Sequence, residues 1–300
     1  LDTPKLQYVL GTTDKVYRAW AKKSGVPIVE EEVGEDAKIY WLGPKRPEKV
    51  ILYLHGGGFL LPMFECALPF WKYVQEQLGK KGLNNTGIAI LQYTLIPTAT
   101  IPTQLKQAVL AVQHLLSIGI SPQNIQLSGD SAGANLIFQL ISHVLHPVDG
   151  VPALKLDAPL RGACLISPWV KIDDCHKYQS FKNPYDIIAE TTAVRWGQEV
   201  LDSGIPDGYT PYIQPLKAPN TWFQDIPKAV DRIYITSGEL DLLRDQGIEF
   251  KSMLEKHHKD IKYVIQSNGV HDGPLLEFVS STPHVSQVTV DIVEWFASGF

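Results

Sequence analysis

Short apolar runs alternate with longer amphipathic stretches along most of this chain. Runs rich in β-branched residues and bounded by Gly, Pro or Asn predict strands at residues 28–33, 37–42, 50–54, 87–92, 125–128, 162–167, 232–236 and 261–266. Helical spacing predicts helices at residues 64–80, 103–117, 132–146, 246–257 and 285–296. Strands that alternate with helices form mostly parallel sheets covered on both faces, whereas the first two strands here indicate an antiparallel hairpin. We therefore expect an α/β fold with a mostly parallel eight-stranded sheet flanked by helices, in a single domain spanning residues 1–300.

One long segment, residues 169–223, interrupts this alternation and predicts no strand. Nine of its 55 residues are aromatic, a larger share than the 10% of the whole chain. A segment of this length is either a lid over a binding site or a helical insertion with its own small core, and the sequence leaves both open. We expect it to form a cap together with an N-terminal helical segment, so that the cap covers about residues 1–27 and 169–223.

Composition narrows the function classes. Lys and Arg number 27 against 32 Asp and Glu, and this net charge of −5 argues against nucleic acid as a partner. Three cysteines cannot build a disulfide framework. No uncharged apolar run approaches the ~18 residues that a membrane span needs. We expect a cytoplasmic location, although a chain that begins at Leu1 leaves a removed leader or anchor open. The sequence predicts no oligomeric state.

The first chemical motif is Gly129-Asp130-Ser131-Ala132-Gly133, which matches the G-x-S-x-G pattern. It lies between a predicted strand and a predicted helix, the setting of a nucleophile elbow. In such a turn the serine backbone is strained, and the flanking glycines leave room where side chains would collide. The alternative is a serine that merely caps the helix.

A second glycine-rich motif, His55-Gly56-Gly57-Gly58-Phe59, follows the strand predicted at 50–54. Consecutive glycines allow successive backbone N–H groups to point at one position, as the oxyanion of an acyl-transfer reaction requires. A phosphate-binding loop is the alternative. It is disfavoured because neither a Gly-Lys-Ser/Thr sequence nor G-x-G-x-x-G spacing is present.

Two polar loops follow the last two predicted strands. Asp241 comes after the strand at 232–236, and His271 comes after the strand at 261–266. Open α/β sheets place their sites at the carboxyl ends of such strands. The chain order Ser131, Asp241, His271 is the order found in one class of hydrolase.

Other acidic residues near these positions have less direct interpretations. Glu239 and Asp245 are alternatives to Asp241 for the carboxylate that orients the histidine. Asp245 could instead cap the following helix. Asp272 is adjacent to His271 in sequence, and we expect its side chain to point elsewhere.

The remaining histidines do not suggest a metal site. His143 and His146 are three residues apart, but no third ligand and no H-E-x-x-H pattern accompanies them. His257 and His258 are predicted to end a helix, where positive charge suits the helix dipole. We expect no metal and no other cofactor.

Together these motifs resemble the hormone-sensitive-lipase-like branch of the α/β-hydrolases, from about Val50 to the end of the chain. The resemblance implies an α/β-hydrolase fold with a helical cap. It also implies that Ser131 is the nucleophile, His271 the base and Asp241 the carboxylate that orients the base. The backbone N–H groups of Gly57, Gly58 and Ala132 would form the oxyanion hole. The stretches 97–102 and 162–169 are similar to those of steryl-acetate-hydrolase-like carboxylesterases.

The chain departs from this family at two places. The family often follows its fourth strand with Tyr-Arg-Leu-Ala-Pro-Glu, whereas residues 93–98 here are Tyr-Thr-Leu-Ile-Pro-Thr. The family commonly follows its histidine with Gly-Phe, whereas Asp272 and Gly273 stand here. Both changes concern the loops and the pocket wall. Five aromatic residues are our candidates for that wall: Phe59, Trp169, Phe181, Trp196 and Trp222.

The sequence thus predicts a serine carboxylic-ester hydrolase that works through an acyl-serine intermediate. Its expected substrates are small or medium apolar esters with a short acyl group and room for a bulky alcohol. A biosynthetic thioesterase, a lactone-forming enzyme or an acyl transferase would use the same triad, so a thioester substrate stays open. A non-catalytic small-molecule receptor is the alternative from another class. Such relatives typically lack a triad residue, whereas all three are present here.

Overall fold

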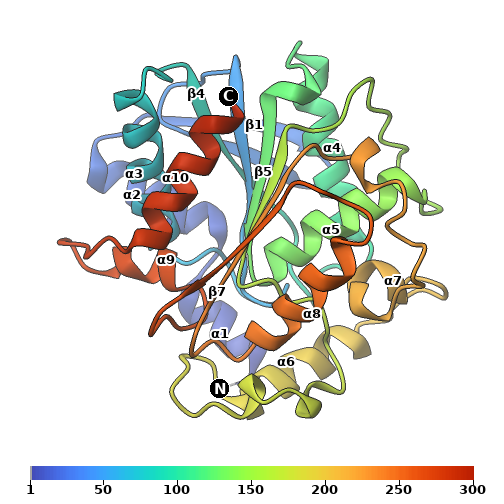
Figure 1. Ribbon diagram of the computed structural model, residues 1–300. Helices are drawn as coiled ribbons and strands as arrows, with labels where there is room; N and C mark the ends of the chain where they lie inside the picture. The colour runs from blue at the N-terminus through green and yellow to red at the C-terminus, as the bar shows by residue number, and fades with distance from the viewer. Residues whose placement is uncertain (1) are drawn as a thin grey trace.

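The computed structural model describes residues 2–300, which form one sheet with the strand order β1-β2-β4-β3-β5-β6-β7-β8 (Figure 1). The strands are β1 (Ile28–Gly34), β2 (Ala37–Leu42), β3 (Lys49–Leu54), β4 (Thr86–Gln92), β5 (Ile125–Asp130), β6 (Gly162–Ile166), β7 (Ile233–Gly238) and β8 (Ile261–Gln266). β2 runs antiparallel to both β1 and β4, and all the other neighbours are parallel. The predicted α/β fold and its leading hairpin are therefore confirmed.

Helices cover both faces of this sheet. They are α1 (Thr3–Leu10), α2 (Thr13–Ser24), α3 (Ala67–Lys80), α4 (Thr103–Ser117), α5 (Ala132–Leu145), α6 (Glu190–Asp202), α7 (Thr210–Ile213), α8 (Arg244–Leu254), α9 (Gly273–Leu276) and α10 (Gln287–Gly299). The helices α3 and α10 cover one face, and α4, α5 and α8 cover the other (Figure 1). In β3, Leu52 and Leu54 belong to one core, and Ile51 and Tyr53 to the other. Successive strand residues point to opposite faces, so a strand buried on both sides is apolar throughout.

Helix ends differ from the predictions by a few residues. The helix predicted at 64–80 begins at Ala67, and the last helix is displaced from 285–296 to Gln287–Gly299. The Ser286 side chain accepts a hydrogen bond from the Thr289 N–H at 3.4 Å and so caps this last helix. An apolar periodicity does not mark such a cap, which explains the shift.

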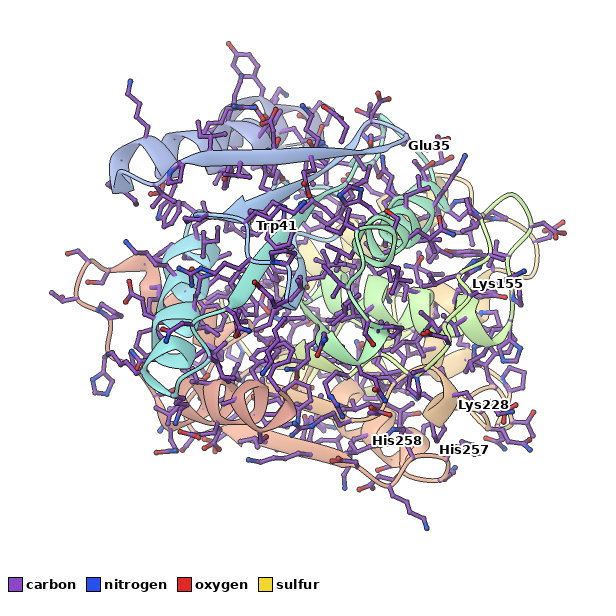
Figure 2. The ribbon with its side chains drawn as sticks, turned by 90° about the horizontal axis from the view of Figure 1, so that it is seen from above. Glu35, Trp41, Lys155, Lys228, His257 and His258 are labelled. Atoms are coloured by element: carbon purple, nitrogen blue, oxygen red, sulfur yellow. The ribbon has the colours of Figure 1, made fainter. Side chains whose placement is uncertain are left out.

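The prediction for His257 and His258 is wrong, because α8 ends at Leu254 and both histidines lie beyond it. They lie at one edge of the molecule (Figure 2). The Nε2 atom of His257 is 2.7 Å from the Asn220 carbonyl, and that of His258 is 3.0 Å from the Val230 carbonyl. These histidines therefore tie loops together.

The segment 169–223 contains α6, α7 and short 3₁₀ turns, and none of its residues forms a strand. Six of its aromatic side chains are buried in the core on the α5 and α8 side: Trp169, Tyr178, Phe181, Tyr209, Tyr212 and Phe223. Helix α1 lies beside α6, where Thr3 donates a hydrogen bond to Glu199 (Figure 1). The two segments predicted as a cap are thus in contact. Leu1, the first residue of that prediction, lies outside the described residues.

Two further expectations concern the whole chain. Cys66, Cys164 and Cys175 are all free thiols. Among residues 2–300, every helix is too short or too polar to cross a membrane.

Candidate active site

Ser131 occupies a sharp turn between β5 and α5. Its φ of 50° and ψ of −116° are strained for a residue with a side chain. A Cβ atom at Gly129 would lie 2.6 Å from the carbonyl carbon of Gly133, and one at Gly133 would lie 1.9 Å from the Leu54 carbonyl oxygen. Only glycine fits at either position, so the G-x-S-x-G spacing is what allows the turn. The structure therefore has the geometry of a nucleophile elbow.

The His-Gly-Gly-Gly loop after β3 lies against this elbow. Gly57 and Gly58 have φ values of 97° and 65°, in the left-handed region that favours glycine. Asp130 fixes the loop, because its Oδ1 accepts the Gly56 N–H at 2.9 Å and the Tyr53 hydroxyl at 2.6 Å. The acidic residue of the G-x-S-x-G motif thus holds the two motifs together.

His55 at the start of this loop serves the fold. Its Nδ1 is 2.8 Å from the Gly56 carbonyl, and its Nε2 is 3.1 Å from the Thr13 hydroxyl. Its ring stacks on Tyr93 at 4.4 Å, and burial lowers the pKa of His55 to about 4. The neutral ring can therefore donate from Nδ1 and accept at Nε2, which links the loop to the N-terminal segment.

The backbone N–H groups of Gly57, Gly58 and Ala132 near Ser131 have no acceptor among residues 2–300, and the same is true of their neighbours Phe59 and Gly133. The first two lie in the glycine loop, and Ala132 is the first residue of α5, whose N-terminal N–H groups lack intrahelical partners. Donors left free in this way suit an oxygen that gains negative charge.

Asp241 and His271 meet across the loops that follow β7 and β8. The Nδ1 of His271 lies 3.1 Å from Asp241 Oδ1, and both side chains are buried. Asp245 does not take this position: its Oδ2 accepts the Ser180 N–H at 2.9 Å, and its Oδ1 pairs with Arg244. The structure brings Asp241, rather than Asp245, to the histidine.

Electrostatics around His271 are dominated by carboxylates. Burial alone lowers the pKa of His271, but Asp272, Asp241 and Asp186 raise it to about 10. Burial alone raises the pKa of Asp241, but the His271 charge and hydrogen bonds lower it below its ordinary value. Asp241 is therefore a carboxylate that stabilises positive charge on the histidine.

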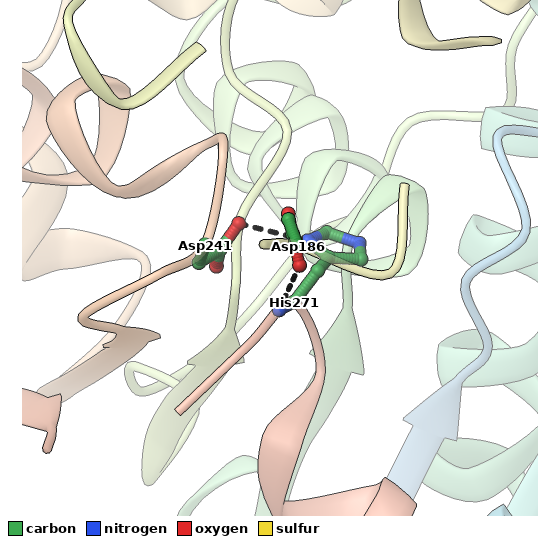
Figure 3. Close-up of side chains that lie close together, drawn as sticks. All are labelled: Asp186, Asp241 and His271. Atoms are coloured by element: carbon green, nitrogen blue, oxygen red, sulfur yellow. Dashed lines mark hydrogen bonds and ion pairs between the residues drawn. The ribbon is translucent and has the colours of Figure 1, made fainter. Parts of the chain in front are cut away.

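Asp186 is a site residue that the sequence reasoning missed. Figure 3 shows its side chain beside those of Asp241 and His271. Its Oδ1 accepts the His271 N–H at 2.8 Å, and its Oδ2 accepts the Leu242 N–H at 2.8 Å. One ligand-type atom from each of the three side chains lies within 4.8 Å of the others. The hydrogen bonds among Asp186, Asp241 and the loops that follow β7 and β8 explain why these three side chains lie close together. Nothing in the sequence distinguishes Asp186 from Asp173 or other acidic residues of the same segment.

The expectation that Asp272 points away from its neighbour is wrong. Asp272 Oδ2 lies 3.3 Å from His271 Nε2, whereas Ser131 makes no hydrogen bond to that nitrogen. Asp272 has a φ of 54°, and its N–H is held by the Ser167 hydroxyl at 3.0 Å. This left-handed backbone turns the side chain back towards the ring. The departure from the Gly-Phe pattern was the only sequence signal.

Ser131, His271, Gly57 and Gly58 line one cavity of about 930 Å³. Two of the five aromatic candidates, Trp169 and Trp196, also line it. A Cβ atom at Gly58 would lie 3.6 Å from the Trp196 ring and 3.8 Å from the Trp169 ring. Apolar residues that were not predicted complete the wall, among them Trp20, Ile187, Ile188, Leu275 and Phe278.

The other three aromatic candidates lie elsewhere. Phe59 is fully buried in the core beside Tyr93. Phe181 is also in the core and makes an edge contact with His176. Trp222 stacks on His146 at 3.9 Å, on a different surface groove. Aromatic content alone does not tell a pocket wall from a packed core.

A family model described as alpha/beta hydrolase fold matches residues 51–274. Lipase 2 from Moraxella sp. is 27% identical over 240 residues, which cover 70% of this chain and 51% of that protein. A Schizosaccharomyces pombe protein with the provisional name steryl acetyl hydrolase mug81 is 24% identical over 243 residues, covering 78% of this chain and 62% of its own. The chain thus spans only about half to three-fifths of these relatives.

A solved structure gives the same assignment for the fold. An esterase from the bacterial hormone-sensitive lipase family matches with a TM-score of 0.71 and 20% identity, covering 100% of this chain and 99% of that one. The matched family model includes the strands that carry Ser131, Asp241 and His271. The chain therefore belongs to the α/β-hydrolase-fold family and is similar to its hormone-sensitive-lipase-like members.

Proposed function

We propose that this chain is a serine carboxylic-ester hydrolase. One observation carries the proposal: a strained serine, the His271–Asp241 pair and a loop with free N–H groups meet at a single apolar cavity. In this proposal Ser131 is the nucleophile, His271 the general base and Asp241 the residue that orients the imidazole. Gly57, Gly58 and Ala132 supply the oxyanion hole.

The reaction would proceed in two acyl-transfer steps. His271 Nε2 takes the Ser131 proton as Oγ attacks the ester carbonyl carbon, and the carbonyl electron pair moves onto oxygen. Each N–H donor facing this oxyanion contributes ~3–4 kcal/mol in the transition state. The tetrahedral intermediate then expels the alcohol, which takes the proton from Nε2 and leaves an acyl-serine. Water repeats the attack and releases the acid.

The shape of the cavity favours a short acyl group and a bulky apolar alcohol. Its volume lies in the ~300–1,000 Å³ range of small-molecule sites. The Trp169 and Trp196 rings close the space beside Gly58, next to the proposed oxyanion hole. The wall also includes the apolar side chains of Trp20, Leu275 and Phe278, against which a ring system could pack. The name of the S. pombe relative, which mentions a steryl acetyl ester, supports this substrate class.

The nucleophile is tested by replacing Ser131. We expect Ser131→Ala to lose about 10⁶-fold in kcat on p-nitrophenyl acetate, the loss that removal of a triad serine causes. The exposed Ser121→Ala should keep full activity and serves as the control. A fluorophosphonate should label the wild type on the peptide that contains Ser131. Residual activity above a few per cent in Ser131→Ala would mean that the nucleophile is wrongly assigned.

Product analysis separates hydrolysis from its alternatives. With the wild type, we expect free acid and alcohol in equal amounts. If acyl groups are instead recovered on an added alcohol, amine or thiol, the protein is an acyl transferase rather than a hydrolase. Ester binding without any turnover would indicate a receptor.

A further inference from the structure

The loops that carry Asp241 and His271 are joined by backbone hydrogen bonds at their bases, whereas at their tips their own residues meet through the side chains of Asp241 and His271. Near the ends of β7 and β8, the Glu239 N–H donates to the Gln266 carbonyl at 2.9 Å and the Leu240 N–H donates to the Gly269 carbonyl at 2.7 Å. Beyond these bonds, the contact that aligns the base is the side-chain contact between His271 Nδ1 and Asp241 Oδ1 at 3.1 Å. The distance between the imidazole and its carboxylate then depends on what holds the tips.

A residue from the segment 169–223 makes this connection. Asp186 Oδ1 accepts the backbone N–H of His271 itself, and Oδ2 accepts the N–H of Leu242, which follows Asp241. Both distances are 2.8 Å. We propose that Asp186 is a positioning residue, which clamps the Asp241 loop and the His271 loop together so that the base stays aligned. This inference rests on the proposed function, because it concerns the base of that reaction.

The surroundings of Asp186 show that its carboxylate is held in place. Its Oδ1 also accepts the Ile187 N–H at 2.7 Å, which fixes the turn before α6. Burial raises the pKa of Asp186, and Asp241 adds to this, while the His271 charge and the two backbone N–H groups oppose it. Tyr185 and Ile187 on either side are exposed. Asn183 Nδ2 also donates to the Leu240 carbonyl at 2.8 Å, so this stretch is attached to the Asp241 loop at more than one point, whereas the bond to the His271 loop is made by Asp186.

The same stretch also lines the cavity. Ile187 and Ile188 directly follow Asp186 and belong to the cavity wall. A ligand packed against these isoleucines would bear on the residues that carry the clamp. Occupancy of the part of the cavity lined by these isoleucines and alignment of His271 are therefore mechanically connected.

The test compares Asp186→Asn and Asp186→Ala with Asp173→Asn. Asp173 is a carboxylate of the same segment, but it pairs with Lys217 at 2.6 Å and does not touch the catalytic loops. The amide of Asp186→Asn has the same shape but one acceptor atom instead of two, and it carries no charge. Active sites are counted with a fluorophosphonate, so kcat is expressed per competent site. Thermal unfolding reports on stability separately.

On the alkaline plateau of the pH profile, where the base is free in every variant, we expect Asp186→Ala to lower kcat per titrated site by about 10- to 100-fold with KM changed by less than about twofold, because misplacing a base by an ångström costs rate rather than binding. Asp186→Asn should show a smaller loss in the same direction. In both, the pH at which kcat/KM is half-maximal should fall, because a negative charge near His271 has been removed. Asp173→Asn should match the wild type.

Two outcomes would overturn the proposal. One is an unchanged kcat per site and pH profile in Asp186→Asn and Asp186→Ala. The other is a loss confined to the melting temperature, which would make the clamp merely structural. If Asp186→Ala does not fold, the isosteric Asp186→Asn decides. Failure of the proposed function would look different, because Ser131→Ala would then remain active whatever the Asp186 variants do.

Discussion

Asp272 should set the pH range of the proposed hydrolase. Its Oδ2 lies 3.3 Å from His271 Nε2, the atom that takes the Ser131 proton in the proposed mechanism. The pKa of His271 is raised to about 10, and burial together with Asp130 raises the pKa of Asp272 well above its ordinary value. The pair therefore retains one proton at neutral pH. Whether that proton lies on Nε2 or on Oδ2, the lone pair of Nε2 is engaged.

The sign of the effect follows from this shared proton. Activity requires the pair to lose it, so kcat/KM should rise about tenfold per pH unit until the pH approaches ~10. At about pH 8 roughly one molecule in a hundred would have a free base. The groups that face His271 are Asp241, Asp186 and Asp272, and all three act in this direction.

Replacing Asp272 by Asn should move the profile towards lower pH. Two unit charges 3.3 Å apart interact by about 5 kcal/mol at an effective dielectric constant of ~20, or roughly four pKa units. Burial and Asp130 raise the pKa of Asp272, which weakens the effect of its charge on His271, so we expect a smaller fall, ~2 units. Asn tolerates the left-handed backbone at this position, so the turn should persist. At about pH 8 the variant should be roughly 50-fold more active than the wild type.

The measurement is kcat/KM from acidic to alkaline pH, with acid release followed by pH-stat titration. Asp207→Asn, an exposed carboxylate on the segment 169–223, is the control and should follow the wild-type curve. A wild-type profile that levels off near neutrality, together with an unchanged profile in Asp272→Asn, would refute the reasoning. In that case the Nε2–Oδ2 contact is absent in the working enzyme.

Two shorter predictions complete the set. Asp241→Asn should reduce kcat by about 10⁴-fold, the cost of a wrong imidazole tautomer. Asp245→Asn should reduce kcat far less, because Asp245 bonds Ser180 and Arg244 rather than His271. Equal losses of kcat in steady-state kinetics would assign the orienting carboxylate to Asp245. In a series of p-nitrophenyl esters, acetate and butyrate should be cleaved faster than palmitate, because Trp169 and Trp196 narrow the space beside Gly58. A cleavage rate that rises steadily from acetate to palmitate would show that the part of the cavity that receives the acyl group is open.

Much of the fold was predictable because its signals are local. Each buried strand is a short apolar run, and the two glycines around Ser131 are required by contacts of 2.6 Å or less that any side chain would make. The loops of Asp241 and His271 were predictable for the same reason. A parallel sheet places the carboxyl ends of all its parallel strands at one edge, so position in the sequence fixes position in space.

The residues that escaped prediction act through contacts that no local pattern encodes. Asp186 lies in an irregular segment, and its partners are 56 and 85 residues away. Phe181 and Trp222 lie in the same segment as Trp196, yet of these three side chains only that of Trp196 reaches the cavity. Which face of an irregular segment turns inward is decided by the surface on which it packs.

Asp272 shows how a single residue can change a site while the rest of the machinery stays the same. A glycine after the histidine, as in the Gly-Phe pattern, would supply the same left-handed turn with no side chain on it. With aspartate there, the φ of 54° directs a carboxylate at Nε2 and adds a third negative group to those already facing the ring. The turn and the base are retained, and what changes is the proton affinity of the base. Substitution at this position is therefore a way to tune the working pH of such a site without moving Ser131, Asp241 or His271.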